Sequence, residues 1–82
     1  MDRPWSIYLL SCSDGSIYTG ISMDVEMRVK RHNKHMGSKY VAARLPATLL
    51  FQKEIGTRSE AAKEEYRVKQ LSREEKLNYA KA

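Results

Sequence analysis

Apolar and polar residues alternate along the first part of the chain. Two runs, 5–12 and 17–21, are rich in aromatic and β-branched residues and flank a short polar segment at 13–16 that contains Asp14-Gly15. Two such runs on either side of a turn sequence are typical of a β-hairpin. The pattern therefore predicts two adjacent antiparallel strands.

The length of the turn decides which side chains share a face of this hairpin. A two-residue turn would place Tyr8 and Tyr18 on opposite faces. A three-residue turn, with Gly15 left-handed in a bulge, pairs Tyr8 with Gly20 and brings both tyrosines to one face. We favour the longer turn because it also sorts the apolar residues onto one face, which can then pack on a helix. That face consists of Trp5, Ile7, Leu9, Ile17, Thr19 and Ile21.

The rest of the chain has the pattern of three helices and one further strand. The expected elements are a helix over 24–35, a strand over 47–53, a helix over 59–71 and a last helix from about 73. The two later helices each begin at a capping box, Thr57 with Glu60 and Ser72 with Glu75. We therefore expect one α+β domain over residues 1–82, in the order β-β-α-β-α-α.

Polar side chains interrupt the inward faces of two of these helices. In the first helix, Val25, Val29 and Met36 define an apolar stripe, and Arg28 and His32 fall within or next to it. Burying a charge without a partner is expensive, so these residues belong either to a satisfied core pair or to a functional site.

The helix over 59–71 carries a similar anomaly. Ala61, Ala62 and Val68 mark its buried side, and Glu65 projects between them, whereas Glu64 is expected on the solvent side. A carboxylate on an apolar face either pairs with a buried cation or binds a metal ion. Both uses remain open at this point.

The charge distribution narrows the choice of partner. The 82 residues carry a net charge of +5, and no acidic residue occurs between Met27 and Gln52. This basic segment suits an anionic polymer, although a solvated face that aids solubility is the alternative. Its cations are Arg28, Lys30, Arg31, Lys34, Lys39 and Arg44, of which the last five are candidate nucleic-acid-binding residues.

Several classes of protein are disfavoured. No apolar run approaches the ~20 residues of a membrane span, and 1–5 lacks the features of a signal peptide, so we expect a cytoplasmic monomer that does not associate with membranes. The single Cys12 forms no internal disulfide, and one cysteine with two histidines falls short of a structural zinc site.

If the inward polar residues converge, they have the chemistry of a phosphodiester hydrolase. Glu65 would hold a divalent cation, and Arg28 would neutralise charge that builds on phosphorus. Tyr18 would accept a proton from the attacking water, with His32 assisting or binding phosphate near Tyr8. We therefore treat these five residues as one candidate site.

The sequence resembles the GIY-YIG nuclease domain, and within it the small stand-alone bacterial YhbQ-like proteins. The resemblance covers nearly the whole chain, with Ser6 and Thr19 in place of a glycine and an isoleucine of the two motifs. It is carried by Ser6-Ile7-Tyr8, by the block 12–20 that includes Tyr18-Thr19-Gly20, by 28–33, by Gly37-Ser38-Lys39-Tyr40 with Arg44 and Pro46, and by Glu60-Ala61 followed by Glu65.

This resemblance implies three antiparallel strands flanked by helices, and metal-dependent cleavage of a nucleic-acid backbone. Matched by position, the family's two motif tyrosines, helix arginine, following histidine and metal-binding glutamate fall on Tyr8, Tyr18, Arg28, His32 and Glu65. The expected activity is hydrolysis of DNA, including branched or single-stranded forms, by in-line attack of water with one Mg²⁺ or Mn²⁺ ion. Target choice would rest on the basic segment or on a partner protein.

Two other functions remain open. A nucleic-acid-binding module on the same scaffold would bind in a salt-sensitive way without cleaving. An interaction protein whose basic face meets an acidic protein would leave the inward Arg28, His32 and Glu65 unexplained.

Overall fold

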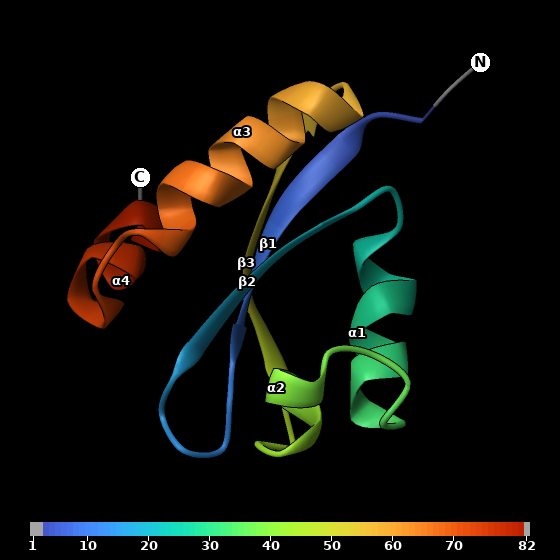
Figure 1. Ribbon diagram of the computed structural model, residues 1–82, viewed down its shortest axis with the longest axis vertical. Helices are drawn as coiled ribbons and strands as arrows, with labels where there is room; N and C mark the ends of the chain where they lie inside the picture. Colours follow the sequence, from blue (N-terminus) through green and yellow to red (C-terminus); the bar gives the residue numbers. More distant parts are fainter. Residues whose placement is uncertain (1–2, 82) are drawn as a thin grey trace.

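A small antiparallel sheet lies between two pairs of helices in the computed structural model (Figure 1), which describes residues 3–81. Met1, Asp2 and Ala82, which belong to the expected 1–82 domain, lie outside the described residues. The strand order is β2-β1-β3, so β2 is an edge strand. The elements are β1 (Trp5–Ser11), β2 (Ile17–Ser22), α1 (Val25–Asn33), α2 (Lys39–Ala42), β3 (Thr48–Gly56), α3 (Arg58–Lys69) and α4 (Arg73–Lys81).

The hairpin of β1 and β2 has the longer turn and the register expected from it. Tyr8 pairs with Gly20 and Leu10 with Tyr18. The Cys12 amide donates to the Ser16 carbonyl at 3.0 Å, and Gly15 has a φ of 85°, in the left-handed region that glycine adopts without strain. Both tyrosines therefore project from the same face of the sheet, as predicted.

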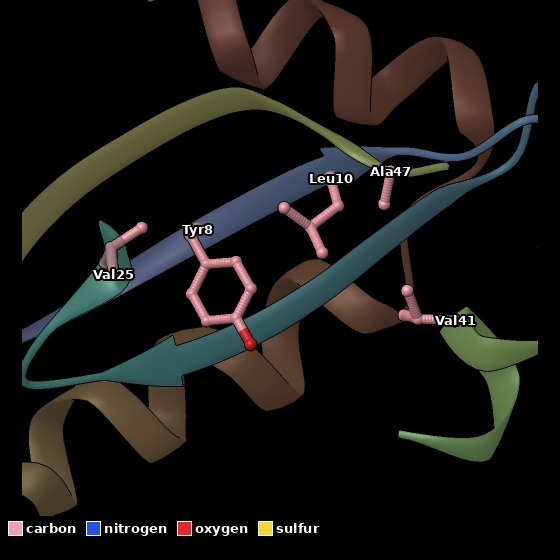
Figure 2. Close-up of a cluster of buried hydrophobic side chains, with 5 residues drawn as sticks. All are labelled: Tyr8, Leu10, Val25, Val41 and Ala47. Atoms are coloured by element: carbon pink, nitrogen blue, oxygen red, sulfur yellow. The ribbon is translucent and has the colours of Figure 1, made fainter. Parts of the chain in front are cut away.

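The sheet separates two hydrophobic clusters. On one face, Tyr8 and Leu10 pack with residues of α1, α2 and the start of β3; five members, Tyr8, Leu10, Val25, Val41 and Ala47, are drawn in Figure 2. On the other face, Ile7 and Leu9 pack with Val68 of α3 and with side chains of α4. Alternate residues of β1 thus enter opposite cores, which is why this strand is buried on both sides.

Side-chain caps fix where the helices begin. The Asp24 carboxylate accepts from the Met27 amide at the start of α1, which selects Asp24 over Ser22 as the cap. At α3 the Thr57 hydroxyl accepts from the Glu60 amide while the Glu60 carboxylate accepts from the Thr57 amide, and Ser72 and Glu75 make the same reciprocal pair before α4. Both predicted capping boxes are present.

The structure departs from the sequence interpretation at several places. The short helix α2 was not predicted, and α1 ends at Asn33, so that Met36 lies beyond it and is exposed. Strand β3 runs three residues further than expected, to Gly56, and its apolar residues Leu49 and Leu50 are largely exposed. Ala62 is exposed rather than buried. No helix within residues 3–81 is long and apolar enough to cross a membrane.

Candidate active site

Three of the five predicted site residues form one aromatic cluster. Tyr8 comes from β1, Tyr18 from β2 and His32 from the last turn of α1. The ring centres lie 6.4 Å apart for the two tyrosines and 5.3 Å apart for Tyr18 and His32, which meet edge to face. Tyr8 and His32 are buried, whereas Tyr18 is only partly buried. Tyr18 is therefore the member of the cluster that solvent can reach.

Tyr8 and His32 form a buried hydrogen-bonded pair. Their Oη and Nε2 atoms are 3.0 Å apart. Burial raises the pKa of Tyr8 far above its usual value, and the neighbouring Tyr18 adds to the rise. Burial also lowers the pKa of His32 below 6.5. Both groups are therefore neutral near pH 7, when their hydrogen bond joins a phenol and a neutral imidazole.

Two glycines leave the space that this pair needs. A Cβ on Gly20 would lie 2.5 Å from the Tyr8 Oη, and a Cβ on Gly37 would overlap the Nδ1 atom of His32. Neither glycine has a positive φ, so both are required for space rather than for backbone conformation. Figure 2 shows the Tyr8 hydroxyl lying over β2, where Gly20 is found. The pairing of Gly20 with Tyr8 was predicted from the register, but the approach of Gly37 to His32 was not.

Asn33 holds the end of α1 against the sheet. Its Nδ2 donates to the Ala47 carbonyl and its Oδ1 accepts from the Ala47 amide, both at 2.9 Å. This two-way hydrogen bond joins the last residue of α1 to the entry of β3. The adjacent His32 is thereby kept over Tyr8.

Arg28 differs from its expected placement. Its side chain is exposed and does not lie on the inward face of α1. It is nevertheless close enough to lower the pKa of both Tyr8 and His32 by its positive charge. The long arginine side chain can follow an apolar surface while its charged end stays in water, which explains why helical angle alone placed it inward. Arg28 thus stands at the solvent side of the cluster.

Glu65 is the acidic member of the site. Its side chain is 23% exposed and forms an ion pair with Lys69 at 3.4 Å. Its negative charge contributes to the raised pKa of Tyr8, which places the α3 carboxylate within electrostatic reach of the aromatic cluster. Tyr8, Tyr18 and His32 are thus in contact, and the charges of Arg28 and Glu65 both act on Tyr8; Tyr18, Arg28 and Glu65 are at least partly accessible to solvent.

The neighbouring Glu64 has a structural role that was not predicted. It accepts two hydrogen bonds from Arg67, at 2.9 and 3.0 Å, and one from the Tyr79 hydroxyl at 2.7 Å. These contacts lower the pKa of Glu64, and the one with Tyr79 joins α3 to α4. Glu64 is therefore only partly exposed, at 22% of its side chain, and not the plain surface residue that helical spacing suggested.

The donor set limits how a metal ion could bind. Residues 3–81 hold no group of three or more His, Cys, Asp or Glu side chains arranged around a common point. A closed all-protein metal site therefore does not fit. A Mg²⁺ ion commonly takes one or two carboxylates and completes its shell with water and substrate phosphate. The single Glu65 carboxylate fits that kind of site, where a metal ion would replace Lys69 as its partner.

Most of the predicted nucleic-acid-binding residues are free to meet a partner. Lys30, Arg31, Lys34 and Lys39 are all exposed, and Lys30 makes only a surface pair with Glu26. Arg44 is the exception. Its Nε donates to Asp14 and its Nη1 to the Tyr40 carbonyl, both at 2.9 Å, and its guanidinium lies 3.7 Å from the centre of the Tyr40 ring. Arg44 thus organises the loop around α2 instead of projecting as a free cation.

Sequence reasoning missed the residues that surround Tyr18. The ring of Tyr40, in α2, stacks near the ring of Tyr18, with 6.1 Å between their centres. Lys69 of α3 and Tyr18 line one surface groove. Lys69 could have been noticed because it follows Glu65 by four residues on a helix. Tyr40 gave no periodic signal, because α2 has only four residues.

A sheet carrying paired tyrosines, with a histidine from the following helix and a glutamate from a later one, defines a GIY-YIG type of fold. The model of the GIY-YIG catalytic domain matches residues 4–78. The chain therefore belongs to the GIY-YIG domain family, and this domain suggests a member of a nuclease superfamily that binds nucleic acid.

Within this family the relatives are UPF0213 proteins. A UPF0213 protein of Staphylococcus aureus is 45% identical over 75 residues, which cover 92% of both chains. Another from Staphylococcus saprophyticus is 46% identical over 77 residues, covering 94% of this chain and 93% of the relative.

Two solved structures have the same fold. The NMR structure of a UPF0213 protein from Bacillus halodurans has a TM-score of 0.57 at 40% identity, covering 92% of this chain and 80% of the other. That of a protein from E. faecalis has a TM-score of 0.67 at 38% identity, covering 98% and 85%. The three-stranded antiparallel sheet with helices, in the predicted order, thus matches the fold of these structures.

Proposed function

We propose that the protein is a metal-dependent nuclease that hydrolyses phosphodiester bonds in DNA, including branched or single-stranded forms. One observation carries the proposal: the accessible Tyr18 lies against the buried Tyr8–His32 pair, and the charges of Arg28 and Glu65 both act on Tyr8. A hydroxyl, a cation and a carboxylate in one region are the groups that phosphodiester hydrolysis requires.

The accessible residues would carry the chemistry. Tyr18 is placed to relay the proton of a water molecule that attacks phosphorus in line with the leaving oxygen. Arg28 would balance the negative charge that grows on the phosphoryl oxygens, since its charge already acts on Tyr8 and His32. We assign contact with substrate to these two residues and to Glu65.

The buried pair would act as positioning residues. His32 is 2% exposed, so direct binding of phosphate, one of the roles considered for it, does not suit its placement. Its Nδ1 has no hydrogen-bond partner within residues 3–81. The direction of the Tyr8–His32 hydrogen bond follows the tautomer of the ring, and either direction holds the two rings together. The pair so formed supports the ring of Tyr18 from behind.

Glu65 would hold the metal ion together with the substrate. When bound, a Mg²⁺ or Mn²⁺ ion would polarise a phosphate oxygen and stabilise the leaving oxygen. The Glu65 carboxylate is partly exposed and pairs with the amine of Lys69. A surface ion pair of this kind contributes about 1 kcal/mol or less, so exchange of Lys69 for a divalent ion with phosphate is inexpensive.

Cleavage of labelled DNA tests the proposal. We expect the wild-type protein to cut single-stranded or flapped DNA with Mg²⁺ or Mn²⁺ and not with EDTA, and Glu65→Gln to be slower by about 100-fold or more. Glu74→Gln is the matched control, because Glu74 is an exposed glutamate in the first turn of α4. It should cut like the wild type.

Equal cleavage by the wild-type protein and Glu65→Gln would sink the proposal, because the activity would then come from a contaminant. Salt-sensitive binding without cleavage in any divalent ion would point instead to a binding module on the same scaffold. Tyr18→Phe separates the two functions further. It should lose cleavage while it still binds DNA, since the ring and its packing remain.

A further inference from the structure

A groove beside the candidate site has no role in the chemistry described above. It is an open hollow of about 270 Å³ at the outer edge of β2, between α2 on one side and α3 and α4 on the other. Its lining combines two aromatic rings with two amines. The residues are Ile17, Tyr18, Thr19, Tyr40, Lys69 and Lys76. Because Tyr18 belongs to this lining, the groove leads directly to the candidate site.

Tyr40 offers a ring that is fixed in place yet open to solvent. Its side chain belongs to a residue that is 41% exposed. The guanidinium of Arg44, itself tied to Asp14, lies over the ring at 3.7 Å, and the ring is stacked near Tyr18 with an interplanar angle of 28°. Arg44 covers one face of the ring, so a nucleic-acid base would stack on the part of the ring that remains exposed, at little entropic cost because the ring is already held.

The two amines give the groove a local positive charge. Lys76 donates to the Ile17 carbonyl at 3.0 Å, which turns its amine toward the outer edge of β2. Burial and the proximity of Lys69 lower the pKa of Lys76, so the two cations stand near each other. Lys69 is paired with Glu65 at 3.4 Å, so the positive charge of the two amines is only partly balanced, and a backbone phosphate beside them would balance the rest.

Thr19 lines the groove from the edge strand and is itself buried, so the groove's accessible groups are the rings and amines of its other residues. Among the strands of residues 3–81, none lies beyond the outer edge of β2.

We propose that this groove binds an unpaired nucleotide strand next to the scissile phosphate, with a base stacked on Tyr40 and the backbone phosphate held by Lys69 and Lys76. The inference rests on the proposed nuclease function and specifies its substrate as DNA with an unpaired segment. In a duplex each base is already stacked between its neighbours, so only an unpaired base can use the Tyr40 ring.

Binding of a fluorescein-labelled single-stranded oligothymidylate, followed by anisotropy in EDTA, tests the groove apart from catalysis. Tyr40→Ala should weaken binding about 5- to 150-fold, the loss of one base-stacking interaction, whereas Tyr40→Phe should bind like the wild type. Tyr66→Ala is the matched control, because Tyr66 of α3 is 73% exposed and lies outside the groove. A blunt duplex of equal length should respond little to Tyr40→Ala.

A second pair of variants keeps the test independent of the folding of Tyr40→Ala. Lys69→Gln should weaken oligothymidylate binding and reduce the dependence of log K on log salt by about 0.7, the value for one phosphate contact on a single strand. Lys63→Gln changes an exposed lysine of the same helix outside the groove and should have a smaller effect. The inference is overturned if each groove variant weakens binding no more than its control, that is, Tyr40→Ala no more than Tyr66→Ala and Lys69→Gln no more than Lys63→Gln. It is also overturned if the groove variants weaken duplex and single-strand binding equally.

The outcomes for the groove and for the nuclease are distinguishable. If groove variants lose oligothymidylate binding but no metal supports cleavage, the groove stands and the nuclease proposal fails. If Glu65-dependent cleavage is observed while Tyr40→Ala and Lys69→Gln bind like the wild type, the nuclease stands and the groove inference fails.

Discussion

The buried Tyr8–His32 pair depends on residues that contribute no side chain. Gly20 and Gly37 lie against the Tyr8 hydroxyl and the His32 ring so closely that a methyl group at either place would overlap them. Both rings are almost completely buried and cannot swing into solvent. The geometry of the candidate site therefore depends on glycine at positions 20 and 37 as much as on the five site residues.

Gly37→Ala should destabilise the protein by about 1–3 kcal/mol, the range for forcing extra volume into a packed site. The new methyl group would displace the His32 ring and break its hydrogen bond to Tyr8, so cleavage should fall as well. Urea unfolding measures the loss of stability. In a His32→Ala background the penalty of Gly37→Ala should largely disappear, and a full penalty there would contradict the steric account.

The buried His32 should make stability depend on pH. Its pKa is lowered in the folded state, while in the unfolded chain it stays near ~6.5. Below that value the unfolded state takes up a proton that the folded state resists, so stability is highest above pH ~6.5 and is lost as the pH falls. The melting temperature should drop between pH ~7 and ~5.5, and His32→Gln should flatten this slope. His35→Gln, which changes an exposed histidine, should leave it unchanged.

Single residues were predictable where one local rule decides their direction. The alternation of a strand placed Tyr8 and Tyr18 on one face, and the helical angle placed His32 inward. Arg28 lies at the margin of the same helical stripe, and there its long side chain and its charge decide in favour of solvent. The need for glycine at position 37 arises only from the approach of a loop to a ring, which no local pattern encodes.

Among the elements, the hairpin was the most predictable because its register has a consequence for every side chain. A shift by one residue would have moved the apolar set of β1 and β2 to the wrong face. Strand β3 is less constrained, since it lies at the other edge of the sheet and contains register shifts against β1. The four-residue α2 is too short for any periodicity, although it supplies Tyr40.

Two adjacent glutamates of α3 have different roles, Glu64 in the structure and Glu65 in the proposed chemistry. Glu64→Gln removes the carboxylate that holds Arg67 and Tyr79, so it should cost about 1 kcal/mol of stability and leave the rate of cleavage near that of the wild type. Glu65→Gln should keep its stability within about 0.5 kcal/mol and lose cleavage, because its ion pair with Lys69 lies at the surface. Urea unfolding and a cleavage assay on the same two proteins measure both effects, and the reverse pattern would exchange the roles assigned here.

Across the whole molecule, the sheet brings together groups from both of its faces at one edge. Tyr18 projects with the cluster that packs on α1 and α2, whereas Glu65 belongs to α3, which covers the opposite face. They can act together because Tyr18 lies on the edge strand β2, and Lys69, which pairs with Glu65, lines the same groove as Tyr18. The sequence could identify both residues but not this meeting at the edge, which depends on how two helix pairs enclose three strands.

The net charge of +5 belongs to the whole molecule, and it raises the question of whether DNA is attracted by the general excess of charge or bound at a local surface. The two cases predict different losses of DNA affinity when lysines and arginines are replaced. Arg31→Glu with Lys34→Glu, and Lys63→Glu with Lys81→Glu, each change the charge by four, from +5 to +1, and all four side chains are exposed. If α1 and its following turn bind DNA phosphates, the first pair should weaken duplex binding strongly and reduce its salt slope by about 0.9 for each phosphate that is no longer neutralised. The second pair should have a smaller effect, through long-range attraction alone. Anisotropy titrations over a range of salt concentrations measure both slopes. Equal weakening in the two variants would mean that the basic segment acts only through net charge, and that duplex DNA is held elsewhere on the molecule.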